Sequence, residues 1–199
     1  MGYFGNAGAF LIQTLFGLYL LVIMLRILLQ WARADFYNPL SQFIVKVTNP
    51  PIIPLRRFIP SMRGIDTASV FLLLILKIME LLLLGLLPGQ PLPAIPGLFL
   101  FAIVDLLALL VNVFLFSIFI QAILSWVGGA NYNPIGALLN QLTAPVLRPF
   151  RNMIPPVSGM DLSPMAAMVA IYLVILLVIH PLKDWVGGLT YGIRPTMGF

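Results

Sequence analysis

The chain has 199 residues, of which 61% are hydrophobic and 9% are charged, and its formal net charge is +5. Soluble proteins carry about 25% charged residues, so this composition excludes an ordinary soluble domain and indicates an integral membrane protein. The sequence has no cysteine, which excludes disulfides and thiolate sites, and no long basic run, so we expect anionic lipid head groups as partners and no nucleic acid.

Four stretches are apolar enough to cross a membrane, whose hydrocarbon core of about 30 Å needs roughly 20 helical residues. We predict spans at residues 9–30, 68–87, 98–126 and 165–182. The first and third spans end at Trp31 and Trp126, and an indole suits the lipid–water boundary. The predicted fold is an all-α membrane protein with four transmembrane helices.

After the first span the chain reads Trp, Tyr-Asn-Pro, Thr-x-Pro, Pro-x-Arg, Ile-Pro and Gly-x-Asp, from Trp31 to Asp66. The same order recurs from Trp126 to Asp161, at an offset of 95 residues and without an insertion. This indicates a duplicated unit, which we divide into a first repeat at residues 1–94 and a second at 95–199. Because each unit crosses the membrane twice, both enter from the same side as parallel helix–loop–helix repeats.

Most basic residues lie in the two repeated loops, whereas the N-terminus and the connector at residues 87–98 carry none. By the positive-inside rule, the repeated loops are expected in the cytoplasm and both termini on the outer side.

Each repeated loop is predicted to begin with an amphipathic helix. Asn38 and Asn133 are suited to cap a helix that starts at Pro39 or Pro134. An i, i+3, i+4, i+7 stripe follows in each copy, formed by Leu40, Phe43, Ile44 and Val47, and by Ile135, Leu138, Leu139 and Leu142. We expect Pro50 and Pro145 to end these helices, which are too short to span and so lie in the membrane interface. The stripe can equally pack on the transmembrane bundle, and both contacts can hold together.

Beyond these helices, Pro54 and Pro149 are expected to form rigid turns that hold Arg56 and Arg151 at the head-group level. A guanidinium can bind lipid phosphate, or pair with the aspartate of its own repeat. That aspartate can also cap the next helix, which is compatible with pairing. The candidate lipid- or partner-contact residues are therefore Arg56, Arg151, Pro54, Pro149, Asp66, Asp161, Trp31 and Trp126.

The predicted spans contain polar residues that need a partner, since a charge at the bilayer centre costs about 2.5 to 3.5 kcal/mol. Lys77 and Glu80 share a face of the second span, either as an ion or proton path or as an ion pair that fixes helix register. Asp105 and Asn112 share a face of the third span, with Asp105 near its outer end and able to reach head groups. Arg26 and its repeat counterpart Gln121 are expected to extend toward the cytoplasmic boundary.

No pattern in the chain suggests catalysis. The single histidine, His180, cannot form a zinc or bis-histidine haem site alone, and we find no nucleophile elbow, P-loop or zinc-protease motif. We therefore expect a protein that is not an enzyme and needs no cofactor or metal.

The signature Trp, Tyr-Asn-Pro, Thr-x-Pro, Pro-x-Arg-x-x-Ile-Pro and Gly-x-Asp resembles that of the YggT family of small bacterial membrane proteins, over nearly the whole chain. The second copy, with Ser163-Pro164 after Asp161, is nearest to the family pattern, whereas the first copy has Ala68-Ser69 there. The resemblance implies a bacterial inner-membrane protein linked to survival of hyperosmotic shock. It also implies relatives associated with cell division, nucleoid organisation or assembly of a plastid cytochrome complex.

Two hypotheses follow. The chain is a membrane scaffold or assembly factor whose cytoplasmic loops engage anionic lipid or a partner membrane protein. Alternatively, it is a small ion or solute transporter or channel that acts as a homo-oligomer and uses Lys77, Glu80, Asp105 and Asn112.

Overall fold

The computed structural model describes residues 2–61, 66–126, 133–154 and 161–192, apart from the side chain of Trp126. The described residues contain no strand, and their helices are α1 (Tyr3–Trp31), α2 (Pro39–Arg56), α3 (Thr67–Gly85), α4 (Ile95–Trp126), α5 (Pro134–Met153), α6 (Ser163–Val174) and α7 (His180–Tyr191). A π-helical turn, Ile175–Ile179, joins α6 to α7, so that the two form one continuous rod.

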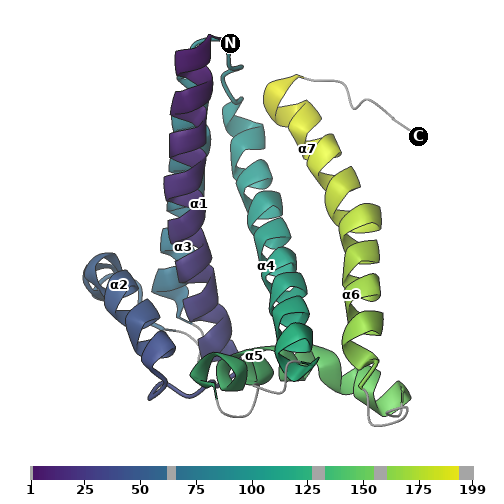
Figure 1. Ribbon diagram of the computed structural model, residues 1–199. Helices are drawn as coiled ribbons and strands as arrows, with labels where there is room; N and C mark the ends of the chain where they lie inside the picture. The colour runs from purple at the N-terminus through teal and green to yellow at the C-terminus, as the bar shows by residue number, and fades with distance from the viewer. Residues whose placement is uncertain (1, 62–65, 127–132, 155–160, 193–199) are drawn as a thin grey trace.

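Four helices of the described residues are long and apolar enough to cross a membrane: α1, α3, α4, and the continuous helix formed by α6 and α7. In Figure 1 they run side by side, with the start of α1 and the end of α7 at one end of the bundle and α2 and α5 at the other. Their outer faces expose large apolar side chains such as Leu15, Phe116 and Val169, as expected where hydrocarbon replaces water as the solvent. The predicted all-α architecture with four spans is confirmed.

The two units have the same order of elements. Helices α1, α2 and α3 form one helical hairpin with a helix in its loop, and α4, α5 and α6 with α7 form the other (Figure 1). The predicted helix–loop–helix repeats are therefore present, while the division of the chain at residue 94 stays a prediction.

The last span extends to Tyr191, beyond the predicted end at residue 182. Pro181 cannot donate a backbone hydrogen bond and would clash with the preceding turn of a regular α-helix. The π-helical turn just before Pro181 widens the helix locally. A π-helical turn of this kind is one of the ways in which a helix accommodates a local irregularity. The helix therefore continues and carries Lys183 inside the span.

The prediction that Pro50 and Pro145 end the loop helices is wrong. Helix α2 continues through Pro50, the half-buried Pro51 and Pro54, and α5 continues through Pro145 and Pro149. Prolines four residues apart lie on one helical face, and all four side chains are exposed. The carbonyl groups that lose a donor to these four prolines therefore point away from the bundle, so the helix can bend there without breaking.

The opposite faces of α2 and α5 are held by packing. The main apolar core joins both loop helices to α1, α3 and α4, and it includes the buried side chains of Ile44 and Ile52 of α2 and Leu138 and Leu142 of α5. Leu147 of α5 is also buried but belongs to a separate cluster. Phe43 and Ile135 of the predicted stripe are exposed. The stripe thus packs largely on the transmembrane bundle, which was one of the two predicted alternatives.

Candidate functional site

The first unit places a buried carboxylate where α2 meets α3. Arg56 lies in the last turn of α2 and not in the predicted proline turn. It forms a bidentate ion pair with Asp66, in which Arg56 Nε lies 3.3 Å from Asp66 Oδ1. Asp66 is 2% exposed and caps α3 through Ser69, whose hydroxyl lies 2.7 Å from Oδ2. Pairing and capping therefore both occur at Asp66.

The second unit repeats this arrangement in a more open form. Arg151 Nε lies 3.1 Å from Asp161 Oδ2, and Asp161 accepts a hydrogen bond of 2.9 Å from the backbone of Ser163. The position equivalent to Ser69 is Pro164, which has neither a hydroxyl nor an N–H. Asp161 is accordingly less enclosed, with 40% of its side chain exposed against 1% for Asp66.

Both carboxyl groups lie outside the spanning helices and have lowered pKa values. Burial raises the pKa of Asp66, but the hydrogen bonds and charge of Arg56 and the hydrogen bonds of Ser69 outweigh it, so the pKa falls below the ordinary value of 3.8. For Asp161 burial also raises the pKa, and the hydrogen bonds from Ser163 together with Arg151 lower it by more. Both aspartates are thus ionised near neutral pH and hold their arginines in place.

A second contact fastens each loop helix to the first helix of its unit. Arg26 of α1 is 5% exposed, donates to Thr48 Oγ1 at 2.6 Å and to Asn49 Oδ1 at 2.9 Å, and lies 3.6 Å from Asp66 Oδ2. At the equivalent position of α4, Gln121 is hydrogen-bonded to Thr143 and Asn140.

The prediction that Arg26 and Gln121 extend to the boundary is therefore wrong. Both side chains turn inward, because the fully buried hydroxyls of Thr48 and Thr143 offer partners that need no exposure to water. The sequence contained one signal for this contact, since a charged residue inside an apolar span usually faces a partner within the protein.

The two loop helices also contact each other. Asn38 caps α2 through the backbone of Leu40 and donates from its amide to the carbonyl of Pro134 at 2.7 Å. The backbone N–H of Asp35 donates to Gln141 of α5 at 2.8 Å. The cap at the start of α2 thereby joins the two units at this end of the bundle.

The remaining predicted contact residues lie around this end. Trp31 is 56% exposed at the end of α1 and makes an edge contact with Phe114. Pro54 and Pro149 are exposed on the outer faces of their helices. The side chain of Trp126, and the repeat residues Gly64, Tyr132, Pro155 and Gly159, lie outside the described residues.

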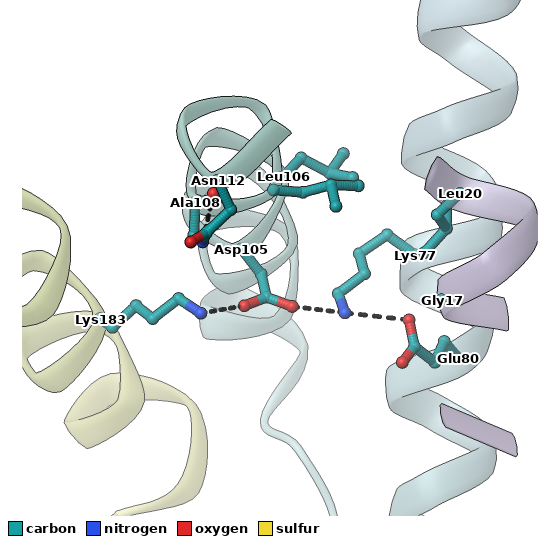
Figure 2. A pocket seen from close by; sticks show the side chains of 10 residues that line it. Gly17, Leu20, Lys77, Glu80, Asp105, Leu106, Ala108, Asn112 and Lys183 are labelled. Atoms are coloured by element: carbon teal, nitrogen blue, oxygen red, sulfur yellow. Dashed lines mark hydrogen bonds and ion pairs between the residues drawn. The ribbon is translucent and has the colours of Figure 1, made fainter. Parts of the chain in front are cut away.

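A separate group of charges lies within the membrane span. Figure 2 shows a continuous line of side chains from Lys183 of α7 through Asp105 of α4 and Lys77 of α3 to Glu80. Lys77 Nζ lies 2.9 Å from Glu80 Oε2, as predicted for residues on one face, and Asp105 forms ion pairs with both lysines. The prediction that Asp105 reaches head groups is wrong, because Lys183 approaches it from α7.

These charges line a cavity of about 210 Å³, together with Asn112, whose amide donates to the carbonyl of Ala108 at 2.8 Å. The repeat counterparts of the four charged residues are the uncharged residues Tyr172, Ile175, Phe10 and Pro88. The charged line therefore belongs to the assembled bundle and not to the repeated unit.

Comparison with known proteins agrees with the repeat. The family model described as CCB3/YggT matches residues 5–87 and 100–182, two ranges displaced by 95 residues. An uncharacterised protein of Pseudomonas aeruginosa is 44% identical over 183 residues, covering 92% of this chain and 93% of that protein. The uncharacterised protein YggT of Escherichia coli is 39% identical over 169 residues, covering 85% of this chain and 87% of that protein. No solved structure matches the chain.

Proposed function

This chain belongs to the CCB3/YggT family, and from that premise we propose that it is a non-enzymatic scaffold or assembly factor of the bacterial inner membrane. In this proposal, the end of the bundle formed by α2 and α5 faces the cytoplasm. It engages anionic lipid or a partner membrane protein and contributes to tolerance of osmotic shock. The termini are then periplasmic.

One observation carries the proposal: each unit presents a half-exposed arginine that is fixed by its own aspartate at the same end of the bundle. The side chains of Arg56 and Arg151 are 41% and 43% exposed although both are ion-paired. A guanidinium has five N–H donors, and the aspartate engages only some of them. The donors that remain can bind a phosphate or a carboxylate while the aspartate holds the orientation.

The neighbours of the arginines support a location at a lipid boundary. Phe58, two residues after Arg56, is 85% exposed, and Met153, two residues after Arg151, is 77% exposed. A basic group flanked by a free apolar side chain suits the region where head groups meet acyl chains.

Complementation of a deletion strain tests this function. We expect the double variant Arg56→Gln with Arg151→Gln to insert at normal levels and to lose growth after osmotic upshift. The matched control, Lys46→Gln with Arg148→Gln, removes the same charge from exposed positions of the same two helices and is expected to retain growth. Full rescue by the arginine double variant would refute the role of these side chains.

A second candidate function, transport of a small ion or solute by an oligomer, is favoured by the charged line inside the membrane. The cavity beside Lys77 and Asp105 has a volume of only about 210 Å³, so a wide path lined by these charges would need several copies. Flux through purified protein in liposomes that is abolished by Glu80→Gln would establish transport and displace the scaffold function.

A further inference from the structure

A second cavity lies next to the charged one and has the opposite character. It is an apolar groove of about 470 Å³ between α1 and α4, with α2 and α5 contributing to its wall. Its lining includes residues at equivalent positions of the two units, such as Leu21 with Phe116 and Leu25 with Ile120. The groove therefore lies where the two units meet, in the half of the bundle nearer α2 and α5.

The groove and the charged cavity adjoin each other. Gly17, Leu109 and Asn112 line both of them. A Cβ atom added to Gly17 would meet no atom within 4 Å, so the missing side chain leaves space at the junction. Together the two cavities have a smaller polar part and a larger apolar part.

We propose that this compartment is a binding site for a neutral single-chain lipid of the monoacylglycerol type. Its hydroxylated head lies beside Lys77, Asp105 and Asn112, and its chain lies in the groove between α1 and α4. The site does not rest on the scaffold function, because neither the paired arginines nor their aspartates line either cavity.

The charges at the polar end determine the class of head group. Two lysines and two carboxylates sum to zero, and each is already ion-paired. A charged head would have to compete for one of these pairs in a medium of low dielectric constant, which is costly. A neutral head leaves every pair intact. It can accept from the ammonium protons that the pairs leave unused and donate to the amide oxygen of Asn112.

The two volumes determine the size of the ligand. At about 30 Å³ per water, the polar cavity has the volume of roughly seven waters, which suits a glycerol-sized head. The adjoining groove is more than twice as large and, apart from Asn112 and Ser117, is lined by apolar residues. Apolar surface of this kind takes up a hydrocarbon chain from the membrane by dispersion contacts.

The probe for this site is a monoacylglycerol with a photoreactive diazirine in its chain, added to the protein in lipid nanodiscs. We expect saturable labelling of residues 18–25 and 113–120, displaced by excess unlabelled monoacylglycerol but not by an alkane or an anionic fatty acid of equal chain length. Gly17→Leu fills the junction and should weaken binding by about tenfold, or about 1.4 kcal/mol. The control Leu15→Phe enlarges an exposed side chain of the same helix and should leave binding unchanged.

A second variant tests the polar end without filling the junction from α1. Asn112→Leu keeps all four charges and should abolish the preference for monoacylglycerol over alkane. Three results would overturn the proposal: labelling that does not saturate and is equal in Gly17→Leu, displacement by the anionic or alkane competitor, or Phe116→Cys crosslinking that shows a second copy covering the groove. Full osmotic rescue by the arginine double variant would refute the scaffold function and leave this labelling unchanged, so the two proposals fail separately.

Discussion

Arg26 donates a buried hydrogen bond of 2.6 Å to Thr48 between α1 and α2, and at the equivalent positions of α4 and α5 the hydroxyl of Thr143 donates to the amide oxygen of Gln121. Each loop helix is thus fastened in its middle by a threonine and at its end by an arginine–aspartate pair. This arrangement explains why the repeat is strongest in the loops, since the fastening residues lie there.

The threonine contact should be stronger in the first unit than in the second. Thr48→Val leaves the Arg26 guanidinium short of a partner, and hydrogen bonds to charged groups contribute about 1.5 to 3 kcal/mol. Thr143→Val loses a bond to a neutral amide, for which about 0.5 to 1.5 kcal/mol is expected. Unfolding titrations in mixed micelles measure both, with the exposed Thr14→Val of α1 as the control. Equal losses in the two units would contradict the role of the Arg26 charge.

Substitution of the aspartate should likewise reduce the free energy of unfolding more in the first unit than in the second. Asp66→Asn leaves the buried Arg26 without its nearby carboxylate and weakens the cap of α3, so a loss of about 3 to 5 kcal/mol is expected. Asp161→Asn breaks a pair whose two side chains are both substantially exposed, for which about 0 to 1 kcal/mol is expected. The same titration measures both variants, and a larger effect at Asp161 would show that burial does not determine the strength of the pair.

Acid should loosen the junction of α2 and α3. The pKa of Asp66 lies below its ordinary value of 3.8 in the folded protein, so the folded state binds fewer protons than the unfolded state. Its contribution to the free energy of unfolding is complete above pH 3.8 and is lost as the pH falls through the lowered pKa. As the pH falls across this range, the free energy of unfolding should decline more steeply for the wild type than for Asp66→Asn. Parallel declines would exclude Asp66 as the group that titrates.

The intramembrane line of charges should depend most on its central lysine. Lys77→Met removes an ion-pair partner from both Glu80 and Asp105, whereas Lys183→Met leaves Asp105 paired with Lys77. We expect the first variant to reduce the yield of folded protein severely and the second only mildly. Lys77→Met with Glu80→Leu replaces the pair by apolar side chains and should recover much of the loss. Failure of the double variant to recover would indicate that the charges do more than balance one another.

Hydropathy predicted the spans because the membrane requires length and apolarity, and the Asn-Pro pairs predicted the starts of α2 and α5 because capping is local. The Arg56–Asp66 pair was also foreseen, since the two residues belong to one short repeat. The partner of Asp105 was not, because Lys183 lies 78 residues away and its position depends on the π-helical turn. The ends of α2 and α5 were predicted wrongly because proline breaks an isolated helix, whereas here the opposite face is held by packing.

The side of the membrane occupied by α2 and α5 is the most direct test of the proposed scaffold function. Because the chain has no cysteine, Ser61→Cys near the end of α2 and Leu92→Cys in the opposite connector, both exposed, can be labelled singly with a membrane-impermeant maleimide. We expect Ser61→Cys to be labelled only in inverted vesicles and Leu92→Cys only in intact spheroplasts. The reverse pattern would place the paired arginines in the periplasm and contradict the proposed engagement of the cytoplasmic leaflet.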